Sequence, residues 1–186
     1  MDKRKWECRK ERNLYLFSRV DEKSVAEVVE KIVEINLYDD LQEEEKREYE
    51  RHPIKLHISS YGGSVYCGFS LVDAILASKT PVHTICLGKA MSMALAIMVA
   101  GHKRVAHPHS TFMYHQLSAV LWGDLTHIKR DVKECERLEA LYDELVLSRT
   151  RILKEKLVEV KEKRQDWFIS VDEALKLGIV DEIVQS

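Results

Sequence analysis

Three polar residues of the types used in nucleophilic catalysis stand in distinctive local contexts. Ser92 lies in an apolar segment rich in small residues, His115 ends an apolar run, and Asp166 precedes two aromatic residues. A serine hydroxyl is a poor nucleophile near neutral pH, so it needs a histidine to take its proton and an acid to orient that histidine. The three types fit an activated serine. Each also has a plain structural interpretation, as a helix contact, a core histidine and a loop or cap acid.

A pair of glycines upstream fits the same chemistry. Gly62 and Gly63 follow an alternating strand-like segment, and glycine lets backbone approach a substrate without interference from a side chain. Ser92 is expected near the start of an apolar helix, where free N–H groups and the helix dipole favour a developing anion. Preorganised backbone donors are each worth about 3–4 kcal/mol to such a transition state. Paired glycines are, however, most often a plain tight turn.

Four segments occur in a distinctive order along the chain. They are the glycine turn at 58–64, Gly-x-Ala-x-Ser-Met at 88–93, Met-x-His-Gln at 113–116 and Asp-x-Phe-x-Ser at 166–170. In this order and spacing they resemble the ClpP family, self-compartmentalised serine peptidases that work with Clp ATPases. The resemblance runs over nearly the whole chain, from about residue 13 to residue 186.

The resemblance implies a role for each candidate residue. Ser92 would be the nucleophile, His115 the general base and Asp166 the orienting acid. The backbone N–H groups of Gly63 and Met93 would form the oxyanion hole. No cofactor is implied.

The pattern of apolar residues predicts an α/β domain. From residue 54 onward, strands at 54–59, 82–87, 104–107, 111–115 and 179–184 alternate with helices at 65–77 and about 90–100, which favours a largely parallel sheet covered by helices. A capping box at Ser24 and Glu27 predicts the start of an earlier helix. The charged stretch 39–53 is expected to be a surface insertion or loop. Residues 1–12 are expected to be a flexible tail before one domain at 13–186.

A long helix is expected from Asp124 to about Lys154, with an apolar stripe along one side. Such a helix would be about 45 Å long, more than a small domain needs. The stripe packs either on its own domain or against another subunit. The resemblance implies the ClpP/crotonase-like fold of repeated β-β-α units, in which a strand and this helix, at about 117–160, form a handle that joins two rings.

Composition excludes several other classes. A net charge of −2 disfavours nucleic-acid binding, and no apolar run reaches the length of a membrane helix. Four scattered cysteines and the lack of an apolar leader predict reduced thiols in a cytoplasmic protein. His102, His107 and His109 lie close together and two of them could ligate zinc, but no carboxylate or thiol stands nearby, so no metal site is expected.

Some positions depart from the family pattern. Tyr61, Ala94 and Leu117 stand where the family usually has proline, glycine and proline. Arg164-Gln165 replaces an acidic-basic pair that helps lock two rings together. The segment before the first strand is shorter than the family's axial gate, which also helps to form the surface where the ATPases dock.

The sequence therefore predicts a serine endopeptidase that cleaves unfolded proteins and peptides inside a ring-shaped oligomer, most simply a double heptamer. Its expected partners are copies of itself, its substrates and a Clp-type ATPase, with no nucleic acid or membrane. Two alternatives remain. One is a catalytically silent structural subunit that assembles with an active partner. The other is an acyl-CoA enzyme of the crotonase fold, against which the Ser-His-Asp set speaks.

Overall fold

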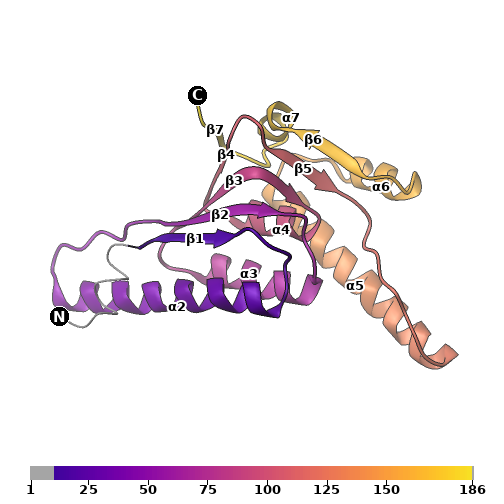
Figure 1. The fold of residues 1–186 in the computed structure, drawn as a ribbon, viewed down its shortest axis with the longest axis horizontal. Helices are drawn as coiled ribbons and strands as arrows, with labels where there is room; N and C mark the ends of the chain where they lie inside the picture. The colour runs from indigo at the N-terminus through magenta and orange to yellow at the C-terminus, as the bar shows by residue number, and fades with distance from the viewer. Residues whose placement is uncertain (1–10, 186) are drawn as a thin grey trace.

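A seven-stranded, largely parallel sheet organises residues 11–185, the part of the chain that the computed structural model describes. Its main path runs β1-β2-β3-β4-β7, while β5 pairs with β3 and carries β6 as an antiparallel neighbour (Figure 1). The strands are β1 (Asn13–Leu16), β2 (Ile54–Ser60), β3 (Val82–Met91), β4 (Lys103–Ala106), β5 (Thr111–Tyr114), β6 (Trp167–Ser170) and β7 (Glu182–Ile183). The predicted α/β class is confirmed.

Helices pack against this sheet because its strands alternate between apolar and polar residues. Along β2, Ile54, Leu56 and Ile58 are fully buried whereas Lys55 is exposed. In Figure 1, α2 and α3 lie side by side on one face of the sheet. The helices are α2 (Glu22–Glu45), α3 (Val65–Ala77), α4 (Met93–Ala100), α5 (Leu125–Arg149), α6 (Lys154–Glu162) and α7 (Val171–Lys176).

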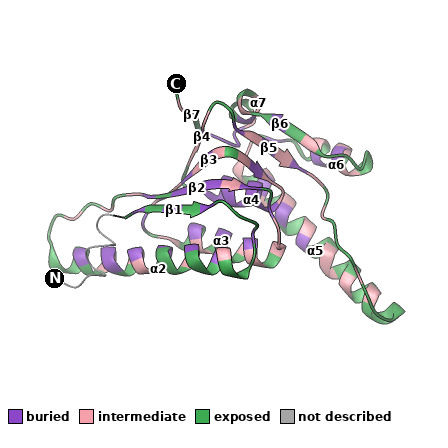
Figure 2. Ribbon diagram, viewed as in Figure 1, coloured by how far each residue is buried: buried purple, intermediate pink, exposed green. Residues whose placement is uncertain are grey.

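Helix α4 lies at the centre of the core. All eight of its residues are buried, which is the pattern of a helix that is apolar on every side. It contacts β3, α3 and α5, and it is drawn almost entirely in the colour of buried residues in Figure 2. A helix so enclosed has little freedom to move, so whatever stands at its N-terminus is firmly placed.

Strand β3 changes partner along its length. Its first half pairs with β4, and its last residues, Lys89 to Met91, pair with β5. The sequence predicted a strand ending at residue 87 and a helix from about 90. The strand instead continues to Met91, because Ala90 pairs with Phe112 in the sheet. The ends of β3 and β5 therefore meet at one edge.

The charged stretch 39–53 is more ordered than predicted. Helix α2 continues to Glu45, and Asp39 is fully buried. Arg12 donates to both oxygens of Asp39 at 2.6 and 2.9 Å, and Tyr49 and Thr80 donate to them at 2.5 and 2.6 Å. Arg12 thus belongs to the folded domain rather than to the predicted tail. The rest of that tail, residues 1–10, lies outside the described part of the chain.

Two helix boundaries also differ from the prediction. The N-cap of α2 is Asp21, which forms a capping box with Ser24 as the third helical residue, so the helix starts three residues before the predicted box. At its other end α5 stops at Arg149, and a short break separates it from α6. The predicted strand at 179–184 is reduced to Glu182–Ile183.

The first half of α5 projects from the domain together with the extended segment before it (Figure 1). Large apolar side chains are exposed there: Val120 is 78% exposed, Trp122 81% and Leu125 67%. Farther along the same helix, Leu138, Tyr142 and Val146 are buried in the domain. The predicted stripe is therefore divided between the core and the solvent. Among residues 11–185, none of the helices combines the length and apolarity needed to cross a bilayer.

The buried ion pair generates a stability prediction. Asp39→Asn should destabilise the fold by about 3–5 kcal/mol, because it leaves the Arg12 guanidinium buried without its charge partner. Burial opposes ionisation of Asp39, but hydrogen bonds from Arg12, Thr80 and Tyr49 outweigh it and hold its pKa below the usual value. The stabilisation from this carboxylate is therefore present above about pH 4 and lost as the pH falls through the lowered pKa.

Urea unfolding followed by circular dichroism measures both effects. Asp40→Asn is the matched control, because Asp40 is partly exposed and its partner Arg51 keeps Glu43 as a second acceptor. The control should cost less than about 1 kcal/mol. Equal losses in the two variants would contradict the assignment of a buried, uncompensated charge.

Candidate active site

Ser92 occupies a strained turn between β3 and α4. Its backbone has φ 52° and ψ −127°, a positive φ that non-glycine residues rarely adopt. Its N–H donates to the carbonyl of Met113 in β5 at 2.9 Å, and its own carbonyl accepts from the N–H of Leu95 at 2.8 Å. Such a conformation persists only where the surrounding structure holds it, and it turns the side chain out at the end of the strand.

His115 directly follows β5 and reaches the serine. Its Nε2 lies 2.8 Å from the Oγ of Ser92. The contact follows from the sheet, because Met91 pairs with Met113 and both strands run in the same direction. A neutral imidazole whose Nε2 carries no proton accepts the serine hydroxyl in this arrangement. The structure therefore brings together two of the three residues singled out in the sequence.

Asp166 is close in register but is not joined to the histidine. It precedes β6, which runs antiparallel to β5 with Tyr114 opposite Trp167. Continuing that register by one residue sets Asp166 opposite His115. The Asp166 side chain is nevertheless exposed, and among the described residues it forms no hydrogen bond with His115. The three residues thus form a serine-histidine pair, with the acid directly before the adjoining strand.

The glycine turn lies against the other side of Ser92. A Cβ on Gly62 would come within 2.7 Å of the Met91 carbonyl and 2.9 Å of the Met93 nitrogen, and its φ of +93° also disfavours a side chain. Gly63 and Met93 line the same cavity as Ser92 and His115. Within residues 11–185, neither of their N–H groups donates a hydrogen bond. Both donors are therefore available to an oxygen in the cavity.

Comparisons with known proteins agree with this arrangement. The family model described as Clp protease matches residues 5–186. The chain belongs to the Clp protease family. It is 36% identical over 133 residues to the ATP-dependent Clp protease proteolytic subunit of Deinococcus radiodurans, which covers 70% of this chain and 64% of that protein.

A solved structure shows the same fold. A mutant of ClpP1 from Listeria monocytogenes matches with a TM-score of 0.78 and covers 94% of this chain and 92% of its own, at 23% identity. The curated relative aligns over slightly less than two thirds of its length. This member of the Clp protease family thus has the family's α/β fold over nearly all its residues.

A network behind the serine was missed by the sequence analysis. The Tyr142 hydroxyl donates to the Ser92 carbonyl at 3.0 Å, and burial raises the pKa of this tyrosine. Tyr114 donates to Asp143 at 2.6 Å, and Lys161 lies 2.5 Å from the other oxygen of that carboxylate. The apolar stripe placed Tyr142 on the inner side of α5. No local pattern in the sequence indicates that its hydroxyl reaches a residue fifty positions earlier.

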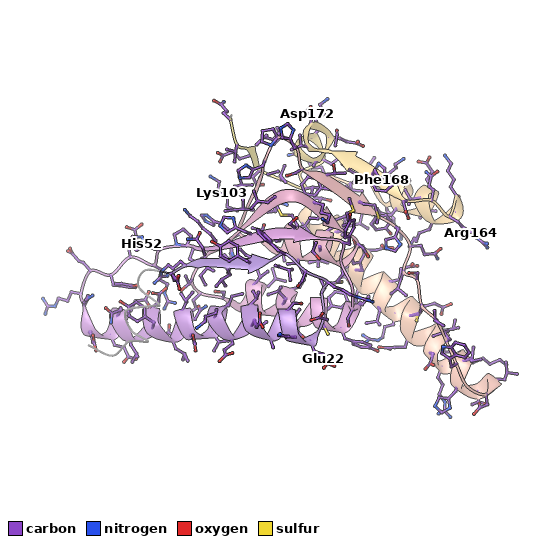
Figure 3. All side chains as sticks on the ribbon, in the orientation of Figure 1. Glu22, His52, Lys103, Arg164, Phe168 and Asp172 are labelled. Atoms are coloured by element: carbon purple, nitrogen blue, oxygen red, sulfur yellow. The ribbon has the colours of Figure 1, made fainter. Side chains whose placement is uncertain are left out.

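Departures from the family pattern surround the site. Leu117, at a position where the family usually has proline, donates its N–H to Glu139 at 3.0 Å, a bond that proline cannot form. Tyr61 is 71% exposed, with the Lys89 ammonium 4.2 Å from its ring centre. Arg164, another departure, lies in the connection between α6 and β6, at the outer edge of the molecule in Figure 3.

The histidines considered as metal ligands have other surroundings. His102 accepts a hydrogen bond from the N–H of Val82 at 3.1 Å. Within the described part of the chain, no three histidine, cysteine or acidic side chains are grouped so that they could hold a metal ion.

Tyr142→Phe tests whether the buried hydroxyl positions the serine. Removing one neutral hydrogen bond of about 1 kcal/mol from the Ser92 carbonyl should slow attack by the hydroxyl about fivefold, with little change in KM. The rate at which a fluorophosphonate probe labels Ser92 measures this directly. Tyr66→Phe, which removes a hydroxyl bonded to Glu134 on the surface, is the control and should label at the original rate. Equal labelling rates for the unmodified protein and the two variants would show that the Tyr142 hydroxyl does not position Ser92.

Proposed function

We propose that this chain is a serine endopeptidase of the ClpP type, which hydrolyses peptide bonds of unfolded proteins and peptides. The observation that carries the proposal is the 2.8 Å contact between Ser92 Oγ and His115 Nε2, formed on a strained residue beside two free N–H groups. Membership of the Clp protease family supports the reaction class. The curated relative is a proteolytic subunit, and its activity is extended to this chain as part of the proposal.

The contacts of Ser92 and His115 support the following steps. Ser92 Oγ attacks the substrate carbonyl carbon while its proton passes to His115 Nε2, and the carbonyl electron pair moves to the oxygen. The N–H groups of Gly63 and Met93 stabilise the resulting oxyanion. The tetrahedral species expels the amine, which takes the proton from His115. Water then attacks the acyl-serine with His115 again as base, and the acid product leaves.

Asp166 is assigned the orienting role. His115 needs an acceptor on its second ring nitrogen to hold the tautomer with an unprotonated Nε2. The register of β5 and β6 supports Asp166 for this role, because extending the pairing by one residue beyond Tyr114 and Trp167 would set His115 opposite Asp166. The proposal requires the exposed Asp166 side chain to turn toward the ring.

Assembly into rings is the second part of the proposal. The projecting half of α5 and the segment before it expose Val120, Trp122 and Val132, and exposed apolar surface of this kind marks protein interfaces. Rings of seven, paired through this handle, would enclose the sites in a cytoplasmic chamber. A Clp-type ATPase is the proposed partner for folded substrates.

One observation favours a second candidate function. Asp166 forms no hydrogen bond with His115 in the described structure, and a subunit without an oriented histidine would be catalytically silent. Such a subunit would keep the fold and assemble with an active partner. The two candidates differ in whether Ser92 reacts.

Ser92→Ala tests the leading proposal. The variant should lose peptide hydrolysis by a factor of about 10⁴ or more and lose all labelling by a fluorophosphonate, because the nucleophile is gone. Its circular dichroism and assembly mass should be unchanged, since the removed hydroxyl contributes little packing. Mass mapping of the labelled peptide in the unmodified protein should identify Ser92.

Ser118→Ala is the matched control, because Ser118 lines the same cavity and, within residues 11–185, forms no hydrogen bond with a histidine. It should keep both labelling and hydrolysis. Labelling at Ser64 or Ser118 instead of Ser92 would overturn the assignment. An unlabelled but correctly assembled protein would favour the silent subunit.

The assembly prediction concerns the exposed part of the α5 stripe. Val132→Glu places a charge in the proposed handle interface and should halve the assembly mass, leaving single rings, as measured by native mass spectrometry. Arg130→Glu, at an exposed position on the opposite side of the same helix, should leave the mass unchanged. A stable monomer of the unmodified protein at micromolar concentration would contradict the ring proposal.

A further inference from the structure

We infer that the pocket beside Ser92 takes a basic side chain, an arginine or a lysine, and that Glu139 selects it. The inference rests on the proposed function, because it names the residue that supplies the carbonyl attacked by Ser92. It adds a substrate class to that function.

The pocket has room for one side chain. Its volume is about 240 Å³, below the range of about 300–1,000 Å³ typical of small-molecule sites. Ser92 and His115 line it together with Leu117, Glu139 and Tyr142. A side chain next to the scissile bond can therefore lie in the same cavity as the Glu139 carboxylate.

Glu139 is anchored so that it faces this pocket. Its Oε1 accepts from the N–H of Leu117 at 3.0 Å, and only about a fifth of its side chain is exposed. The bond ties the carboxylate to the segment that directly follows His115. The carboxylate therefore cannot swing into solvent without breaking this contact.

The charge of Glu139 is incompletely neutralised. Lys161 lies 2.5 Å from Asp143 but 3.6 Å from Glu139, so its ammonium is bound mainly to Asp143. Within residues 11–185, Lys161 is the one cation within ion-pair distance of these two carboxylates, so together they carry one negative charge more than this cation balances. A cationic substrate group would supply the missing partner, and charge-assisted hydrogen bonds are stronger than neutral ones.

A positively charged residue, Arg19, is also present in the pocket. Arg19 also lines the cavity, next to Gly63, where its Cγ would be 2.9 Å from a Cβ on that glycine. Within residues 11–185 it forms no ion pair with Glu139. Its positive charge disfavours a basic side chain beside Gly63, so the inference places the basic group next to Glu139.

Binding to the Ser92→Ala protein tests the inference without requiring catalysis. Two fluorescent peptides of one sequence are compared, differing only in arginine or its neutral analogue citrulline at the position before the cleaved bond. Fluorescence anisotropy should show the arginine peptide binding about tenfold more tightly, a preference that falls steeply with salt. Equal affinities, or a preference for a third peptide with glutamate at that position, would overturn the inference.

Variants locate the selecting charge. Glu139→Gln keeps an acceptor for the Leu117 N–H but removes the charge, so the arginine preference should disappear. Lys161→Met removes the nearby cation and should increase the preference. Glu136→Gln, an exposed acid on the same helix, is the control and should change nothing. A preference that survives Glu139→Gln in a folded protein would show that another group selects the peptide.

Measurements of labelling, cleavage and binding distinguish a failure of this inference from a failure of the proposed function. If a fluorophosphonate labels Ser92 but the arginine and citrulline peptides are cleaved and bound equally well, the specificity inference fails and the peptidase proposal stands. If the probe does not label Ser92 while the arginine preference in binding is present and depends on Glu139, the peptidase proposal fails and the pocket assignment stands.

Discussion

The strained backbone of Ser92 is held from three directions, and the rest of the site depends on that restraint. A non-glycine residue at positive φ costs about 1–3 kcal/mol, so it persists only where packing leaves no alternative. Behind it stands α4, which is buried on every side. Beside it β5 accepts its N–H through Met113, and α5 supplies the hydroxyl of Tyr142 to its carbonyl. With the turn fixed, the distance from Ser92 to His115 follows from the pairing of β3 and β5.

The glycine turn also restrains the backbone of Ser92, and this contact explains why its residues are glycines. Gly62 lies so close to the backbone on either side of Ser92 that a Cβ would overlap it. Gly63 bridges to Val20, the residue that leads into α2. The paired glycines are therefore a requirement of close backbone approach and not only a means of turning the chain. The same closeness brings the Gly63 N–H to the cavity.

The sequence predicted those parts of the molecule that depend on local pattern. Helix α3 has the predicted limits of 65–77, and the α/β class and the meeting of Ser92 with His115 agree with expectation. The pairing of the two catalytic candidates came from the family resemblance, because no local pattern carries a contact over 23 residues. The role of Asp166 stays a prediction.

The features that the sequence could not predict are contacts between residues that lie far apart in the chain. Asp39 lies in a charged stretch that is typical of solvated surface. Its carboxylate is nevertheless buried, because it binds the guanidinium of Arg12, which lies 27 residues earlier, directly before β1. Tyr142 and Asp143 look like ordinary helix residues until the fold sets Ser92 and Tyr114 beside them. In each case the deciding interaction joins residues whose neighbourhood exists only after folding.

Helix α2 is fastened near its start to the glycine turn after β2 and near its far end to Arg12, the residue before β1. Near its start, Val20 exchanges backbone hydrogen bonds with Gly62 and Ser64. Near its far end, the Asp39 carboxylate accepts hydrogen bonds from Arg12. At 1.5 Å per residue its 24 residues form a rod about 36 Å long. The attachments near its two ends therefore link Arg12, just before β1, to the glycine turn that lies beside Ser92.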